Sequence, residues 1–422
     1  MTIDVSQADL QRAQLALFEI FATPEGYNDA ASRYAVLHEA APVLQGSDGS
    51  AVLSRYEDCQ AALRDNRLGK STDRNGELPI GSPSPEMTAL RKRLNEASKD
   101  RPNSMLLLNP PDHTRVRGLV SRAFTPRRVA AMRDHIVTLA EECFDAMADQ
   151  REFDLLEALA FPLPVSVIGE LVGVPRQDWA QFRSLVSATA AAIEPAVTVP
   201  ELQLAAEAMD KLWQYFLDLI EVKRQAPADD LLSALIEVSD GDGDMLSEGE
   251  LVASAIVMFA AGFETTTNLI GNMVTAFGRN PEQMVDLRAN PDLVPSAVEE
   301  ILRYDSPVQL DGRTVLEPAQ VAGLDLEVGA RVITMLGAAN HDPTRYTEPR
   351  RFDIRRDEGP PMSFGSGIHY CLGANLARAE AQVVLEGLLR RFSSVELTED
   401  PKRRQRITLS GFEAVPVRVQ PA

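Results

Sequence analysis

Cys371 combines the most reactive side chain of this sequence with its most unusual surroundings. It lies in the segment 364–373, FGSGIHYCLG, whose glycines at 365, 367 and 373 permit positive φ and let the backbone approach a planar group closely. A strong helical pattern follows, so the cysteine precedes a helix N-terminus, where amides and the helix dipole favour a thiolate. Such a thiolate could be a nucleophile, a redox thiol or a metal ligand; an inert cysteine in a glycine turn is the alternative.

The rest of the sequence gives little support to a nucleophile or a redox thiol. A cysteine nucleophile needs a basic partner, and although His369 lies two residues away, no protease signature surrounds the pair. The only other cysteines, Cys59 and Cys143, are distant, and no CxxC pair is formed. A resolving thiol, a disulfide framework and a structural zinc site are therefore poorly supported. The spacing of the loop favours a ligand.

A second unusual group lies inside the clearest helical pattern, 247–278. Ser247 and Glu250 have the spacing of a capping box, and the apolar run after them predicts a buried helix. The segment 261–267, AGFETTT, then brings weak helix formers and Glu264 into that helix. A buried glutamate is costly without a partner. Such a break marks either function or a tolerated kink whose threonine hydroxyls bond to the preceding turn.

Two more pairs have the spacing of neighbours on a helix face. His113 and Arg117, at i and i+4, present two cationic donors that suit a carboxylate ligand. Glu300 and Arg303, at i and i+3, can form an ion pair, and Glu299 is a rival partner at i and i+4. By themselves, both pairs also fit an ordinary solvated face.

The elements that must position these residues are mainly helical. The pattern contains no βαβ alternation and no repeat, so the sequence predicts a mainly α fold with small antiparallel sheets. A long polar connection over 69–112 is expected to be either a functional lid or a disordered loop. Periodicity and stop signals predict helices at 7–21, 126–149, 178–193, 201–224, 229–239, 247–278, 282–289, 293–304 and 373–391, and strands at 51–54, 313–316, 320–322, 325–328, 331–335 and 406–418.

Composition narrows the class of protein. The chain has 422 residues, is 45% hydrophobic and carries a net charge of −20. That charge argues against nucleic acid and anionic membranes as partners. The longest nearly uncharged apolar run, 251–263, is too short to span a bilayer, and the N-terminus lacks a targeting pattern. With three scattered cysteines, we expect a soluble protein of a reducing cytoplasm.

In combination, these motifs resemble those of the cytochrome P450 superfamily, and most of all its soluble bacterial heme-thiolate monooxygenases. The resemblance covers nearly the whole chain and implies a single P450 domain over 1–422. That domain would be a triangular prism with heme between the long distal helix and the helix after the cysteine loop. A β-rich lobe would come from about 30–68 and 310–345. The matching segments, in order, are 109–129, AGFETT at 261–266, EEILR at 299–303, 338–353 with PRRF at 349–352, and FGSGIHYCLG at 364–373.

The resemblance implies that heme b is held by the cysteine loop. Cys371 would be the axial thiolate, and thus the metal ligand, with Phe364 against the ring. The two propionates need charge-assisted hydrogen bonds in a largely apolar pocket, and the family pattern assigns four residues to them: His113, Arg117, Arg313 and His369. The full set implied in cofactor binding is His113, Arg117, Arg313, Phe364, Gly365, His369, Cys371, Gly373 and Ala261.

The catalytic residues implied by the resemblance are Glu264 and Thr265. This acid–alcohol pair would deliver the protons that oxygen reduction consumes, which is general acid catalysis in a mostly dry site. Ala261 and Gly262 would make room for dioxygen. The implied reaction inserts one oxygen atom of O2 into a small-to-medium lipophilic substrate by hydroxylation or epoxidation.

A structural ion-pair triad behind the cysteine loop is also implied. It consists of Glu300, Arg303 and Arg351, and the family pattern selects Glu300 over Glu299 as the acid. The sequence departs from the family at His341, where related sequences have arginine. We expect this to be a surface change.

The substrate pocket implied by the resemblance is small and apolar, which suits a neutral lipophilic molecule. A steroid, a terpenoid, a fatty acid and a polyketide all remain open. Segments 69–109 and 178–226 would form its lid, and Asp311 is expected to face the propionates. The pocket residues are Val257, Ala260, Ala261, Gln309, Leu310, Leu409 and Phe412.

Electrons must come from separate proteins, because three cysteines cannot ligate a cluster as well as heme. A ferredoxin and its reductase are expected to supply them to a monomer. The docking patch would use Arg122 and Arg378, with Arg127 and Arg128 as further candidates, although any of these can be an ordinary solvated arginine. The alternatives are a peroxygenase or nitric oxide reductase on the same scaffold, or a non-catalytic heme- or ligand-binding protein. The acid–alcohol pair argues against them.

Overall fold

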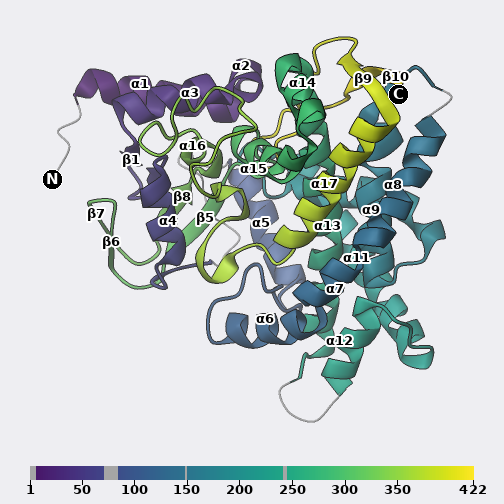
Figure 1. Ribbon diagram of the computed structural model, residues 1–422. Helices are drawn as coiled ribbons and strands as arrows, with labels where there is room; N and C mark the ends of the chain where they lie inside the picture. The colour runs from purple at the N-terminus through teal and green to yellow at the C-terminus, as the bar shows by residue number, and fades with distance from the viewer. Residues whose placement is uncertain (1–5, 71–83, 148–149, 241–244) are drawn as a thin grey trace.

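The computed structural model describes residues 6–70, 84–147, 150–240 and 245–422, and its architecture is mainly helical (Figure 1). The long helix α13 (Glu248–Arg279) runs through the middle of the helical part. It begins at Ser247, whose side chain accepts the amide of Glu250 while the carboxylate of Glu250 accepts the amide of Ser247. The predicted capping box is thereby confirmed, and most residues of the helix are buried.

The other helices surround α13 or cover the main sheet. Those that contact α13 include α9, α11, α15 and α17. The remaining bounds are α1 Gln7–Ala22, α2 Pro24–Asn28, α3 Ala30–Ala40, α4 Tyr56–Arg64, α5 Pro85–Ala97, α6 Asp112–Ala123, α7 Pro126–Ala131, α8 Arg133–Met147, α9 Pro162–Val172, α10 Trp179–Ala191, α11 Val199–Gln225, α12 Leu231–Asp240, α14 Pro281–Ala289, α15 Val294–Tyr304, α16 Leu336–Ala339 and α17 Ala374–Arg391.

The strands form small sheets beside the helices. The main sheet has the order β1-β2-β8-β5-β3, a second has the order β4-β10-β9, and β6 pairs with β7. All pairs are antiparallel, as predicted, except β2 with β8, which run parallel with Ala51 opposite Val332. The bounds are β1 Val43–Gln45, β2 Ala51–Leu53, β3 Leu68–Gly69, β4 Glu152–Asp154, β5 Asp311–Val315, β6 Ala319–Val321, β7 Leu324–Leu326, β8 Arg331–Thr334, β9 Phe392–Leu397 and β10 Pro416–Pro421.

The predicted helices are confirmed to within a few residues, except that 126–149 divides into α7 and α8. The connection 69–112 contains a helix that was not predicted, α5, and part of it (71–83) lies outside the described residues. Its role as a lid stays a prediction. One strand prediction was wrong. The predicted strand 406–418 has regular pairing only in β10, with isolated bridges at Leu409 and Phe412.

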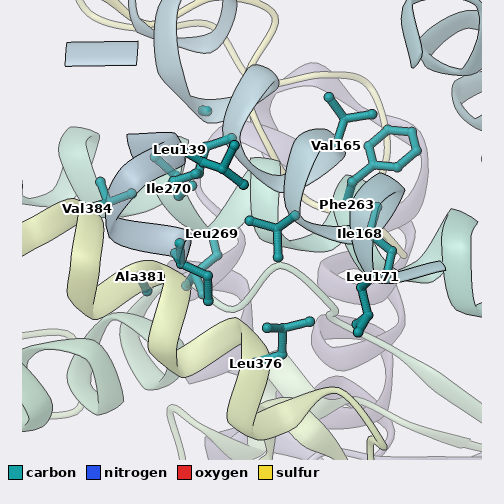
Figure 2. Close-up of a cluster of buried hydrophobic side chains, with 14 of the residues drawn as sticks. Leu139, Val165, Ile168, Leu171, Phe263, Leu269, Ile270, Leu376, Ala381 and Val384 are labelled. Atoms are coloured by element: carbon teal, nitrogen blue, oxygen red, sulfur yellow. The ribbon is translucent and has the colours of Figure 1, made fainter. Parts of the chain in front are cut away.

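The largest hydrophobic core lies between α13, α8, α9 and α17. Figure 2 shows Leu139 of α8, Ile168 of α9, Phe263 and Leu269 of α13 and Leu376 of α17 among its members. Each fully buried side chain of this size contributes about 1.5–3 kcal/mol to folding. This packing fixes α13 against the helix that follows the cysteine loop.

Gly262 serves the packing of α13 against α9. A Cβ placed on it would lie 2.7 Å from Cγ1 of Ile168, which is too close for any larger residue without displacement of the neighbour. Gly262 therefore makes room for a side chain of α9, and its role in making room for dioxygen stays a prediction.

Candidate functional site

The cysteine loop is held by its own backbone. The amide of Cys371 donates to the carbonyl of Phe364 at 3.0 Å, which closes the loop just before α17. Gly365 and Gly367 have φ values of 69° and 71°, a region that favours glycine. Gly367 also lies against the carbonyl of Leu63 in α4, so a Cβ there would collide with backbone. The predicted positive φ is present at these two positions but not at Gly373, whose φ is −83°.

The sulfur of Cys371 is in surroundings that disfavour a free thiolate. The residue keeps an accessible surface, yet the protein atoms packed around it raise the pKa of the thiol. The amide of Gly373 and the guanidinium groups of Arg117 and Arg378 oppose that pKa shift without reversing it. The amides alone therefore do not produce the predicted thiolate, and a coordinated cation would be needed to hold the sulfur in that form.

His113 and His369 come together beside this loop, with ring centroids 4.3 Å apart. Among the described residues, neither ring nitrogen of the buried His113 has a hydrogen-bond partner, and nor does Nε2 of His369. Burial and the nearby charge of Arg313 lower the pKa of both rings, that of His369 to about 3. Buried polar atoms without partners are costly. This set fits a ligand that brings acceptors and negative charge, as the two carboxylates of heme would.

Arg117 and Arg313 approach the same region from different elements. Arg117 on α6 donates through Nη2 to the carbonyl of Tyr370 at 2.5 Å, which ties α6 to the cysteine loop. Arg313 on β5 is 3% exposed and donates to Asp311 at 2.6 Å. The structure thus brings all four predicted propionate residues to one place around the cysteine loop.

Lys70 is a further cation in this region that sequence reasoning missed. Its ammonium pairs with Asp311, the residue that also holds Arg313. Burial opposes ionisation of Asp311, but Lys70 and Arg313 outweigh it and lower the pKa of that carboxyl to about 2. Asp311 therefore holds Lys70 and Arg313 together, and its predicted position facing the propionates stays a prediction. Lys70 reaches Asp311 because β3 pairs with β5, and no local sequence pattern reveals that pairing.

One face of α13 is open in the middle of a buried helix. Ala261 is exposed, and Val257, Ala260 and Thr265 are partly exposed, whereas the residues between them are mostly buried. Their spacing of i, i+3, i+4 and i+8 places them on one side of the helix. The hydroxyl of Thr265 donates to the carbonyl of Ala261 at 2.9 Å. One of the two alternatives for this segment was a threonine hydroxyl bonded to the preceding turn. That bond is present, and Thr265 lies on the open face.

Glu264 lies one residue before Thr265 and is buried, with 7% of its surface exposed. Its Oε1 accepts Nη1 of Arg404 at 3.0 Å, and Nε of the same arginine donates to the carbonyl of Phe412. Arg404 was not predicted. The pair joins α13 to a segment 140 residues further along the chain, so no spacing rule could reveal it.

The ion-pair network behind the loop has a different third member from the one predicted. Glu300 on α15 accepts Nε and Nη2 of Arg303 at 2.7 and 2.8 Å, and Nε of Arg356 at 3.2 Å. The side chain of Arg351 is 58% exposed and pairs with acids of its own loop. Only its carbonyl joins the network, as an acceptor from Arg303. The prediction of Arg351 was wrong because the chain turns and brings Arg356 inward.

The rival acid Glu299 and the unusual His341 are also placed by the structure. Glu299 pairs with Arg378, so the choice of Glu300 as partner of Arg303 is confirmed. His341 is 6% exposed, and its Nδ1 contacts the carbonyl of Gly337 at 2.9 Å. Burial lowers its pKa to about 3. The expectation of a surface change at His341 was wrong: the ring is neutral and internal.

The predicted pocket residues outside α13 are packed inside the protein. The side chain of Gln309 bonds with Tyr34 and the carbonyl of Ser306, and Leu310 belongs to a core cluster with residues of α1 and α3. Phe412 is 1% exposed beneath the guanidinium of Arg403. Their place in the substrate pocket stays a prediction. Leu409 is 9% exposed and lies in a short bridge with Val308.

The candidate docking arginines differ in their surroundings. Arg378 pairs with Glu299 and stacks over Phe364 at 4.5 Å, and Arg128 pairs with Asp229. Arg122 and Arg127 are exposed.

In the described part of the chain, no helix is both long enough and apolar enough to cross a membrane.

Comparisons with known proteins agree on one family. A family model described as Cytochrome P450 matches residues 194–419. Cytochrome P450 107B1 of Saccharopolyspora erythraea is 39% identical, over 92% of this chain and 95% of that protein. The vitamin D(3) 25-hydroxylase of Pseudonocardia autotrophica is 38% identical over 92% and 93%. The 6-deoxyerythronolide B hydroxylase of Saccharopolyspora erythraea is 37% identical over 92% and 95%. The ligand-free crystal structure of CYP164A2 from Mycobacterium smegmatis superposes with a TM-score of 0.85 at 34% identity, covering 96% of this chain and all of that one.

Proposed function

The chain belongs to the cytochrome P450 family, and from that premise we propose roles for its individual residues. As a member it is a heme b-dependent monooxygenase, and bound heme activates O2 with two electrons from outside. One oxygen atom enters a lipophilic substrate, and the other leaves as water after taking up two protons. The protein must therefore hold heme, exclude bulk water and deliver those protons at the right place.

Cys371 is proposed as the iron ligand. The closed loop and the two glycines with positive φ support this role. Four residues are proposed to bind the propionates: His113, Arg117, Arg313 and His369. The buried ring nitrogens without partners support it most directly, because an acceptor-rich ligand would satisfy them.

Glu264 and Thr265 are proposed to deliver the protons. The Thr265 hydroxyl now donates to Ala261 but can also accept hydrogen bonds, so it can hold a water or pass a proton on the open face of α13. Glu264, the residue before Thr265, can exchange a proton through water, and its carboxylate is held in place by the hydrogen bond from Arg404. The open face over 257, 260, 261 and 265 is the single observation that best supports catalysis, because it leaves room for oxygen and substrate beside an acid and an alcohol.

The substrate is proposed to be neutral and lipophilic. The open face of α13 is formed by Val257, Ala260, Ala261 and Thr265, which offer apolar surface and a single hydroxyl. Because the relatives include a 6-deoxyerythronolide B hydroxylase and a vitamin D(3) 25-hydroxylase, macrolides and secosteroids are the first compounds to screen. A low-to-high-spin shift of the heme spectrum on binding would identify the substrate class.

A ferredoxin and its reductase are proposed as the electron donors, in the cytoplasm, to a monomer of this chain. The exposed Arg122 and Arg127 on α6 and α7 support docking near the cysteine loop, since Arg117 of α6 bonds to that loop. Arg378 and Arg128 are less suited, because each is already neutralised by an acid.

Two variants test these assignments. In Cys371→Ala, the reduced carbon monoxide complex should lose the red-shifted Soret band of thiolate ligation; its survival would contradict the ligand assignment. In Thr265→Ala, heme content should be unchanged while product formed per NADPH falls about tenfold with a surrogate ferredoxin system. Unchanged coupling would contradict the proton-delivery role.

A further inference from the structure

Glu194 is a buried acid that the proposed reaction does not use. It lies in the connection 192–198 between α10 and α11 and is 8% exposed. Its carboxylate accepts three consecutive backbone amides, those of Ile407, Thr408 and Leu409, at 2.9, 3.0 and 3.1 Å. Three successive amides aimed at one anion form a concave anion-binding backbone, which fixes that backbone as well as the anion.

Two further bonds join the same segments. The hydroxyl of Thr408 donates to the carbonyl of Ile193 at 3.1 Å, and Nη2 of Arg406 donates to the carbonyl of Ser187 on α10 at 3.2 Å. Segment 406–409 is therefore attached to α10 and to the connection after it by side chains from both partners.

The other edge of this segment is attached to the rest of the pocket region. The amide of Gln309 donates to the carbonyl of Thr408 at 3.0 Å, and the amide of Ser410 donates to the carbonyl of Pro307 at 2.9 Å. Leu409 and Val308 form the bridge between these bonds. Segment 407–410 thus lies between the α10–α11 connection on one side and residues 307–309 on the other.

Burial of the Glu194 carboxylate costs desolvation free energy, which the bonds to the 407–409 backbone must offset. Burial raises the pKa of Glu194, and the three amides and the charge of Arg406 oppose that shift. Tyr27 of α2 is near enough for its own pKa to be raised by the acid, after burial. An apolar residue could fill the site without this desolvation cost. The carboxylate instead gives the 407–409 backbone a position that no apolar contact would define.

We propose that Glu194 is a positioning residue, which fixes the 407–409 backbone against the α10–α11 connection and so holds Leu409 in the wall of the distal pocket and keeps that side closed. The inference rests on the proposed function and on two predictions from the sequence: that Leu409 lines the pocket and that 178–226 belong to its lid. Both α10 and α11 contact α13. In this proposal, a substrate that passes under the lid separates segment 406–409 from the α10–α11 connection. Glu194 then sets how readily they separate.

The test compares heme-loaded protein carrying Glu194→Ala or Glu194→Gln with the wild type. The matched control is Glu201→Gln: the carboxylate of Glu201, a neighbouring acid, accepts the amide of Thr198 at the start of α11 and, among the described residues, makes no hydrogen bond to 407–409. Hydrogen exchange of the 407–409 amides is measured by mass spectrometry. Binding and release of 4-phenylimidazole, a distal heme ligand that needs no knowledge of the substrate, are followed by stopped-flow absorbance.

We expect exchange at 407–409 and release of the probe to become about tenfold faster in Glu194→Ala, and less so in Glu194→Gln, which keeps one acceptor oxygen. Glu201→Gln should resemble the wild type in both. If Glu194→Ala folds poorly, Glu194→Gln alone decides the matter. Unchanged exchange and release in that variant would overturn the inference while leaving the proposed function intact. A wild-type protein that binds no heme or no probe would instead overturn the proposed function.

Discussion

Glu264 and Glu300 are both buried glutamates paired with arginine, yet the two sites are built differently. Glu300 accepts two bonds from Arg303, one from the amide of Asp353 and one from Arg356. Glu264 has one ion pair within the described chain, with Arg404, whose side chain is 24% exposed. Beside Glu264 lies the open face of α13, whereas Glu300 is enclosed.

The difference lies in how completely each acid is bonded. A carboxylate with both oxygens bonded from several sides cannot move or take up a proton without breaking a network, so its role is to hold elements together. A carboxylate with one partner next to an accessible face can exchange that partner for water. We therefore expect changes at Glu300 to affect folding and changes at Glu264 to affect turnover.

The largest expected effect is that of Glu300→Gln. It leaves Arg303 and Arg356 buried beside a neutral group, and loss of one member of such a network costs about 3–5 kcal/mol. Urea unfolding and the heme content of purified protein measure it. Glu299→Gln is the adjacent control, because the side chain of Glu299 is 37% exposed and its one ion pair in the described part of the chain is with Arg378. This substitution should cost less than about 1 kcal/mol. Equal effects of the two substitutions would remove the contrast.

Glu264→Gln should have the opposite pattern of effects: little change in stability and a large loss of turnover. The substituted side chain keeps its size and one acceptor for Arg404, so the free energy of unfolding should change by about 1 kcal/mol or less. Product formed per electron should fall by about 10- to 100-fold, because a general acid is lost. Product and hydrogen peroxide are measured together against NADPH consumed. A stable variant with unchanged coupling would place Glu264 in the same structural class as Glu300.

Sequence reasoning found these two acids for different reasons. Glu300 and Arg303 are one helical turn apart, so their contact follows from local geometry. Glu264 was conspicuous because a charged residue interrupts the apolar pattern of α13, whose length and cap were also local and correctly predicted. Local patterns also drew attention to Cys371 and His113, but the family resemblance supplied Arg313 and joined these distant residues in one site, which no spacing rule does.

Residues that meet only through the path of irregular segments could not be predicted. Arg404 meets Glu264 because the chain returns near its C-terminus in a segment with little regular pairing. The same is true of Glu194 and its three amides. The bond between Gln309 and Tyr34 could not be predicted either, because the two residues lie 275 positions apart. In each case the determinant is tertiary packing rather than propensity or periodicity.

Arg404→Gln should have an intermediate effect. Without the guanidinium, the carboxylate of Glu264 loses its fixed orientation, and we expect coupling to fall about threefold, in proportion to the loss of one partly exposed ion pair. Arg403→Gln is the matched control, because Arg403 pairs with Asp305 at 2.6 Å in the same segment and does not bond to Glu264. In a Glu264→Gln background the Arg404 change should add nothing further. An equal loss of coupling for both arginines would indicate a general disturbance of the segment.

The smallest expected effect, that of Arg351→Ala, decides which arginine completes the Glu300 network. The Arg351 side chain is 58% exposed and pairs only with acids of its own loop, so its loss should change the free energy of unfolding by less than about 0.5 kcal/mol. Its carbonyl, the part that Arg303 uses, survives the substitution. Arg356→Ala removes a guanidinium that is 8% exposed and bonds to Glu300 and Glu358, and should cost about 2–3 kcal/mol. If urea unfolding showed a larger loss of stability for Arg351→Ala than for Arg356→Ala, the family pattern would have identified the third member of the Glu300 network correctly. Arg351 would then belong to the network that encloses Glu300.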